Sequence, residues 1–176
     1  YSLLGEKVYE IFDSECPTLT PTYEPLMITT TIPKVCVGED LVTHEPTYRE
    51  PYIDTDGTII YSSLIKAISE NEPRNTYIAH LAGECMAQGK HIIILCSLIT
   101  QVKALVRAIN GSVELIGSTP KKERERVLKG ENNCIVATYA LAKEGLDKPI
   151  LDTLILASPQ KDYAIVKQSV GRIKRY

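Results

Sequence analysis

The pattern of hydrophobic positions along this chain is most regular from residue 91 onward. Apolar runs of five to seven residues alternate there with stretches whose apolar residues recur at helical spacing. The apolar runs, which predict strands, are residues 91–97, 113–117, 134–138 and 153–159. Helices are predicted at 100–109, after 118, at 139–143 and at 162–175, and Ser118 or Thr119 is expected to cap the second of these. Strands that alternate with helices at this spacing predict an α/β fold with a parallel sheet and right-handed crossovers.

Two more helices are predicted upstream of residue 91. Apolar residues at helical spacing predict the first, which ends near Glu70. Asn71, followed by Pro73, ends that helix and begins the next, which runs to Gly89. The preceding Asp54-Thr-Asp-Gly57 resembles the start of a calcium loop but lacks the later carboxylates, so a simple turn is predicted.

The first third of the chain has a different composition. Residues 3–12 are compatible with a strand that enters the domain, but residues 13–56 contain six prolines, which exclude a continuous helix. Short β-prone pieces at 27–32 and 34–37 predict a strand or two. Several apolar side chains in this stretch favour burial: Tyr23, Leu26, Ile28, Ile32 and Val35. Residues 13–56 are therefore predicted to be a proline-rich insertion that lies against a single domain spanning residues 1–176.

Composition and charge narrow the class of protein. A chain of 176 residues with 44% hydrophobic composition can bury a sizeable core. Residues 1–60 carry 11 acidic and 3 basic side chains, a net charge of −8, whereas the remainder carries a net +6 and is suited to phosphates. The sequence contains no apolar run near twenty residues, so no membrane contact is predicted.

The cysteines indicate a compartment. The five are scattered without a C-x-x-C pair, and two of them, Cys96 and Cys134, lie inside apolar runs. We expect reduced thiols in an intracellular protein, with no metal site.

Candidate chemistry falls at two places. Ligands of parallel sheets meet the carboxyl ends of the strands, where Ser97, Ser118 and Thr138 are suited to hold a sugar-phosphate backbone. The last predicted helix carries Gln168, Arg172 and Arg175 in the pattern Gln-x-x-Gly-Arg-x-x-Arg. Two arginines three residues apart on a helix can reach a single polyanion, although a solvated basic helix end has the same composition.

The order of these motifs resembles the second RecA-like domain of superfamily 2 helicases. Residues 92–97 resemble motif IV, and Gly117-Ser-Thr-Pro together with Glu123-Arg124 resembles the segment that follows motif IV. Residues 137–147 resemble motif V, and residues 168–175 resemble motif VI. The likeness is greatest to the branch of phage recombination helicases and the transcript-release helicases of large DNA viruses. It covers residues 91–176 well, residues 1–12 and 57–90 loosely, and residues 13–56 not at all.

This resemblance implies roles for individual residues. Arg172 and Arg175 would contact the γ-phosphate of ATP as arginine fingers, and Gln168 would sense the nucleotide. Gly145 and Asp147 would join the nucleotide edge to this domain. Thr138, Ser97 and Ser118 would contact backbone phosphates of a single strand, DNA more than RNA.

The chain lacks the other half of such a motor. It contains neither a G-x-x-x-x-G-K-[ST] loop nor a DExx box, so ATP and Mg²⁺ would be bound mainly by an N-terminal RecA-like domain, the expected partner. By itself the chain is predicted to be inactive. It begins at Tyr1 and stops directly after motif VI, which suggests a fragment and a sheet one strand short.

Two other functions remain open at this point. The chain is compatible with a duplex translocase or restriction-type motor that does not unwind strands. It is also compatible with a non-catalytic nucleic-acid-binding module, although such a module has no need of a forked phosphate clamp. A viral role in transcription and a cytoplasmic or virion location follow from the resemblance alone.

Overall fold

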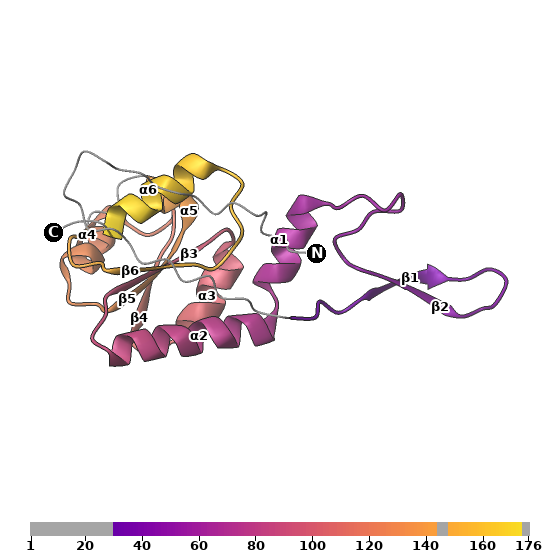
Figure 1. Ribbon diagram of the computed structural model, residues 1–176, viewed down its shortest axis with the longest axis horizontal. Coiled ribbons are helices and arrows are strands. Elements are labelled where there is room, and N and C mark those ends of the chain that lie inside the picture. Colours follow the sequence, from indigo (N-terminus) through magenta and orange to yellow (C-terminus); the bar gives the residue numbers. More distant parts are fainter. Residues whose placement is uncertain (1–29, 144–147, 174–176) are drawn as a thin grey trace, which may run out of the picture.

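The centre of the computed structural model is a four-stranded parallel sheet (Figure 1). The structure describes residues 30–143 and 148–173. The sheet is formed by β3 (Ile92–Cys96), β4 (Ser112–Leu115), β5 (Cys134–Thr138) and β6 (Thr153–Leu156), in the spatial order β4-β5-β3-β6. Each neighbouring pair is parallel. The α/β class, the parallel sheet and its four strands are therefore confirmed.

Helices cover both faces of this sheet (Figure 1). One face packs against α2 (Glu72–Ala87) and α3 (Ile99–Ala108). The other packs against α4 (Lys121–Lys129), α5 (Tyr139–Lys143) and α6 (Tyr163–Ile173). Successive strand side chains point to opposite faces, so Ile92 and Ile94 enter one core while Ile93 and Leu95 enter the other. This explains why the run at β3 is apolar without alternation.

The helix boundaries upstream of the sheet follow the predicted signals. A short helix, α1 (Tyr61–Ser69), precedes α2. Asn71 caps α2, since its side-chain oxygen accepts a hydrogen bond from the backbone N–H of Arg74 at 3.0 Å, and a proline occupies the first turn. Gly89, which follows α2, has a φ of 77°, a left-handed conformation that favours glycine.

The described part of the proline-rich stretch forms an antiparallel hairpin. It consists of β1 (Val35–Glu39) and β2 (Pro46–Arg49), and it extends away from the rest of the molecule (Figure 1). Every residue from 35 to 48 is exposed. The expectation that this stretch lies against the domain is therefore wrong for the hairpin, and Val35, which we expected to be buried, is 44% exposed.

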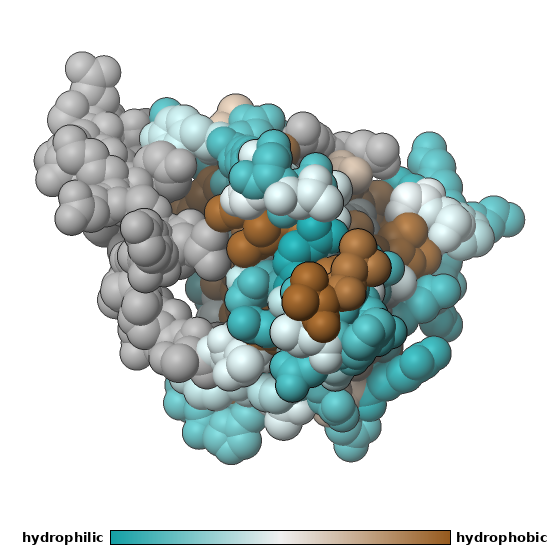
Figure 2. Space-filling view, turned by 90° about the vertical axis from the view of Figure 1, so that its right-hand side faces the viewer, coloured by the Kyte–Doolittle hydropathy of each residue, from teal (hydrophilic) through white to brown (hydrophobic). Residues whose placement is uncertain are grey.

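The tip of the hairpin carries two exposed aliphatic side chains. Leu41 is 94% and Val42 87% exposed. The Asp40 carboxylate accepts hydrogen bonds from the backbone N–H groups of Val42 and Thr43 and stabilises the turn. Figure 2 views the molecule from this end and shows apolar surface surrounded by hydrophilic surface. Residues 3–12, Tyr23, Leu26 and Ile28 lie outside the described residues, and the insertion boundaries remain a prediction.

Residues 54–57 form the predicted turn. The Gly57 N–H donates to the Asp54 carbonyl at 3.1 Å, and Gly57 adopts a φ of 84°. Within residues 30–143 and 148–173, no three side chains of metal-ligating type gather in one place. None of the helices in this part of the chain is both long and apolar enough to cross a membrane.

Candidate functional site

The three hydroxyl residues predicted to bind backbone phosphates all lie at the carboxyl edge of the sheet. Ser97 directly follows β3, Thr138 is the last residue of β5, and Ser118 lies three residues after β4. Cys96 is the register partner of Thr138, so Ser97 and Thr138 stand at the ends of adjacent strands. The fold thus brings together residues that are far apart in the sequence.

A buried polar network beneath this edge centres on Ser158. The Ser158 hydroxyl accepts a hydrogen bond from the Ser97 N–H at 3.0 Å and donates to the Gln101 side-chain oxygen at 2.6 Å. The Gln101 amide nitrogen donates to Asn75 at 3.0 Å and to the Ala157 carbonyl at 3.3 Å. These bonds connect the ends of β3 and β6 with α2 and α3, and they fix the position of Ser97.

The end of β5 is tied to the same network. The Tyr139 hydroxyl donates to the Ser158 carbonyl at 2.7 Å. Burial raises the pKa of Tyr139, so the phenol remains a hydrogen-bond donor at neutral pH. Thr138, which precedes it, is only 8% exposed. A ligand can therefore reach Thr138 only from the rim of the sheet, whereas Ser118 is exposed.

The loop that carries Ser118 is held by Arg124 of α4. Its guanidinium donates to the Gly117 carbonyl at 2.6 Å and to the Thr119 carbonyl at 2.9 Å. The Thr119 hydroxyl accepts from the Ile116 N–H at 3.0 Å. We expected Ser118 or Thr119 to cap α4, but the N-cap residue is Pro120 and no side chain caps the helix. That expectation is wrong because Thr119 turns back to the loop.

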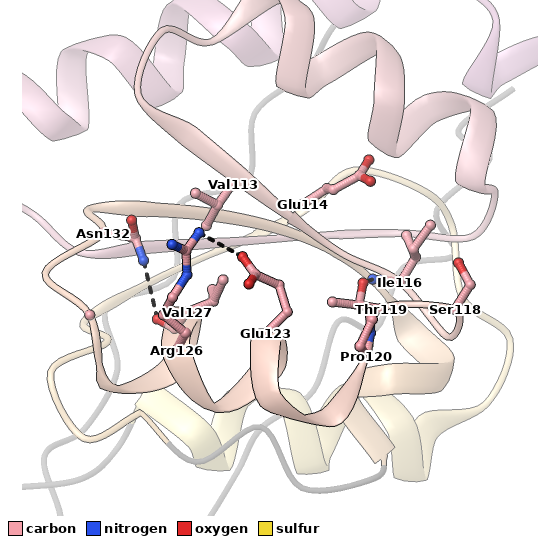
Figure 3. Close-up of a pocket in the computed structure, with 11 residues that line it drawn as sticks. Val113, Glu114, Ile116, Ser118, Thr119, Pro120, Glu123, Arg126, Val127 and Asn132 are labelled. Carbon is pink, nitrogen blue, oxygen red and sulfur yellow. Dashed lines mark hydrogen bonds and ion pairs between the residues drawn. The ribbon is translucent and has the colours of Figure 1, made fainter.

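A pocket of about 650 Å³ lies between the edge strand β4 and α4 (Figure 3). Ser118 and Thr119 line one end, and Arg126 and Asn132 line the other. Arg126 forms an ion pair of 2.8 Å with Glu123 inside it. Because this ion pair leaves little net charge, the pocket itself is less suited to a phosphate than the carboxyl edge beside it.

The predicted nucleotide-contacting residues lie mostly outside the described residues. Gly145, Asp147 and Arg175 fall there entirely, and so does the side chain of Arg172, whose backbone belongs to α6. Gln168 is exposed on α6, whereas the following residue, Ser169, is buried and its hydroxyl donates to the Ile165 carbonyl at 2.7 Å. The roles assigned to these five residues therefore remain predictions.

The sequence reasoning missed two contributors to the site, and it also missed a buried lysine at the amino edge of the sheet. Gln101 and Asn75 are buried polar residues on otherwise apolar helix faces, a signal that the pattern contained. Lys148 is 3% exposed, and its ammonium donates to the carbonyls of Gly130 at 2.8 Å and Asn132 at 2.9 Å. It ties the segment after Asp147 to the end of α4. Burial lowers the pKa of Lys148, and nothing in its local sequence indicates this contact.

A parallel sheet with helices on both faces, whose carboxyl edge carries the hydroxyl residues described above, is compatible with a RecA-like α/β domain. Residues 74–176, more than half of the chain, match the family described as helicase conserved C-terminal domain. The chain belongs to this family. It is the C-terminal domain of a superfamily 2 helicase, as its motifs predicted.

Individual relatives agree with this assignment. A putative ATP-dependent RNA helicase, L396, of Acanthamoeba polyphaga mimivirus is 31% identical over 119 residues, which cover 65% of this chain and 22% of the relative. The structure of T4 UvsW superposes with a TM-score of 0.57 at 22% identity over 64% of this chain and 24% of UvsW. The C-terminal part of the Fun30 ATPase domain gives 0.53 at 11% identity, over 62% of this chain and 38% of that one.

The two structural likenesses show the fold alone. Against the mimiviral relative and UvsW, the chain spans less than a quarter of the matched protein.

Proposed function

We propose that this chain is the strand-contacting and arginine-finger half of an ATP-dependent motor that moves along single-stranded nucleic acid. The carboxyl edge carries the proposal: Ser97, Ser118 and Thr138 meet there, and the buried Ser158 network holds Ser97 in place. Family membership supports the use of ATP. The net charge of +6 over residues 61–176 favours a polyanionic ligand.

In this proposal the nucleotide lies between two domains. Arg172 and Arg175 stabilise the charge that develops on the γ-phosphate, Gln168 senses the nucleotide, and Gly145 and Asp147 join it to this domain. An N-terminal RecA-like domain of the intact protein binds most of the ATP and Mg²⁺. Closing and opening of the two domains then advance the strand.

We propose DNA as the substrate, in transcription, replication or repair. The mimiviral relative is named as a putative RNA helicase, which is a specific reason to keep RNA as the second candidate. We further propose a reducing, intracellular location, because Cys96 and Cys134 are buried free thiols.

The experiment is steady-state ATP turnover by the intact protein with single-stranded DNA, single-stranded RNA or neither. We expect turnover to rise with DNA and to vanish in Arg175→Ala while ATP affinity stays within about tenfold, because a finger acts chiefly on transition-state charge. Stimulation by RNA alone would select the second candidate. Turnover near the parental rate in Arg175→Ala would exclude the assigned finger.

A further inference from the structure

We propose that Arg74, a residue outside the helicase motifs, binds a backbone phosphate of the nucleic-acid strand at the carboxyl edge of the sheet. This inference rests on the proposed function. It adds a positively charged side chain to the phosphate contacts proposed for Ser97, Ser118 and Thr138. Three observations support it: the position of Arg74, its unpaired charge, and its separation from α6.

Arg74 lies in the first turn of α2, which is antiparallel to β3 because α2 leads through Gly89 into the start of that strand. The first turn of α2 therefore lies at the carboxyl end of β3. Consistent with this, the guanidinium lies close enough to Cys96, the last residue of β3, and to Tyr139, the residue after Thr138, to oppose the effect of burial on the pKa of each. Arg74 is thus flanked by the residues next to Ser97 and Thr138.

The charge of Arg74 is not balanced by any described residue. One terminal nitrogen, Nη1, is buried and has no hydrogen-bond partner among residues 30–143 and 148–173. Neither neighbour supplies a negative charge at neutral pH, because burial raises the pKa of Cys96 to about 12 and also raises that of Tyr139. A guanidinium nitrogen that is buried without a partner is unfavourable, so an anionic partner is expected.

The chemistry and location favour a phosphodiester as this anion. The planar guanidinium matches phosphate oxygens in a bidentate geometry, and Arg74 as a whole is only half-buried, so part of it remains open to a ligand. A phosphate of the nucleotide has the same chemistry, but the predicted nucleotide contacts of α6 lie on the other face of the sheet from α2 (Figure 1). The strand, held by Ser97 and Thr138, is the nearer source.

The test measures binding of a labelled 16-nucleotide single strand by the intact protein, without ATP, over a series of salt concentrations. Arg74→Gln removes the charge and keeps a polar side chain. We expect affinity to fall about tenfold and the log-log salt slope to become shallower by about 0.7, the value of one phosphate contact. Arg74→Lys should keep the slope and lose only the bidentate geometry.

Arg107→Gln is the matched control because this substitution removes the same single positive charge. Arg107 is exposed in the last turn of α3, at the opposite edge of the sheet. We expect it to leave the slope unchanged. Separate measurements follow ATP affinity and the thermal midpoint of unfolding, both of which should be maintained in Arg74→Gln.

Each contrary result has a distinct meaning. An unchanged slope in Arg74→Gln, with normal binding by the parent, overturns the inference and leaves the proposed function standing. A lower ATP affinity with unchanged strand binding assigns the anion to the nucleotide. A lower thermal midpoint with an unchanged slope assigns it to a carboxylate elsewhere in the protein, and if Arg74→Gln does not fold, a strand affinity and slope in Arg74→Lys equal to those of the parent overturn the inference. If the parent binds neither DNA nor RNA, the proposed function itself fails.

Discussion

A buried amide, Gln101, organises the carboxyl edge more directly than the hydroxyls that line it. Gln101 is fully buried, and its side chain forms hydrogen bonds with both the Ser158 hydroxyl and the Asn75 side chain. Buried polar groups of this kind stabilise one arrangement only while every partner is present. The position of Ser97 therefore depends on a residue that does not itself reach the edge.

Replacing Gln101 with leucine should destabilise the protein by about 3 kcal/mol, because the Ser158 hydroxyl, Asn75 and the Ala157 carbonyl lose their partner in a dry interior. Urea unfolding measures the change. Gln88→Leu, at an exposed position at the end of α2, is the control and should stay within about 0.5 kcal/mol. A similar loss in both variants would mean that the network contributes nothing specific.

Two buried thiols make stability sensitive to alkaline pH. Burial raises the pKa of Cys96 and Cys134 from 9.0 to about 12, so the unfolded state loses these protons first. The contribution is fully present below pH 9.0 and is lost as the pH rises toward about 12. We therefore expect the free energy of unfolding to fall across this window.

The measurement is urea unfolding at pH values from neutral to alkaline in the parent and in the double variant Cys96→Ala, Cys134→Ala. The fall above pH 9.0 should be smaller in the variant. Lys148, whose pKa is lowered, acts in the opposite direction in both proteins, so the difference isolates the thiols. Cys36→Ala, at an exposed position, should follow the parent. Parallel pH curves for the parent and the double variant would contradict this account.

At the scale of elements, α2 is positioned by its N-cap. The Asn71 side chain accepts from the Arg74 N–H at 3.0 Å and from the Thr30 hydroxyl at 2.6 Å, and donates to the Thr31 carbonyl at 3.1 Å. It thus caps the helix and holds the chain that leads to the hairpin. One side chain connects the two regions.

Asn71→Ala should reduce the free energy of unfolding by about 1–2 kcal/mol, since the cap bond and the link to residues 30 and 31 are lost together. Asn71→Asp keeps an acceptor for the cap and should recover about half of this. Thermal unfolding distinguishes the variants. Equal stabilities for Asn71→Ala and the parent would show that water replaces the cap.

The sequence was most informative where local chemistry decides the structure. The apolar run of β3 and the signals at Asn71 and Gly89 predicted their elements, because burial on two faces and helix ends leave direct traces in residue type. The cap of α4 was not predictable, since Arg124 folds back onto Gly117 and Thr119 through contacts that only the assembled loop permits. Likewise, the partners of Gln101 lie 26 and 57 residues away along the chain.

At the scale of the whole molecule, acidic and basic residues are concentrated in different regions of the chain. The hairpin extends from the sheet and its helices (Figure 1). Most basic residues lie in the sheet and its helices, whereas the hairpin carries exposed acidic side chains and one basic residue, Arg49 of β2. Residues 35–48 include Glu39, Asp40 and Glu45 and no lysine or arginine. An acidic projection placed over the proposed phosphate-binding edge of the sheet would repel the strand, so we expect the hairpin to lie off the nucleic-acid path.

Replacing residues 35–48 with a short glycine-serine linker should leave strand affinity unchanged, or slightly raised at low salt where screening is weakest. Stability should change by less than about 1 kcal/mol, because every residue removed is exposed. Oligonucleotide binding by the intact protein measures the strand affinity, and urea unfolding measures the stability. The double variant Glu39→Gln, Glu45→Gln keeps the Asp40 turn and separates the effect of charge from that of the hairpin itself. A loss of affinity greater than about tenfold, roughly 1.4 kcal/mol, would instead make the hairpin part of the binding surface.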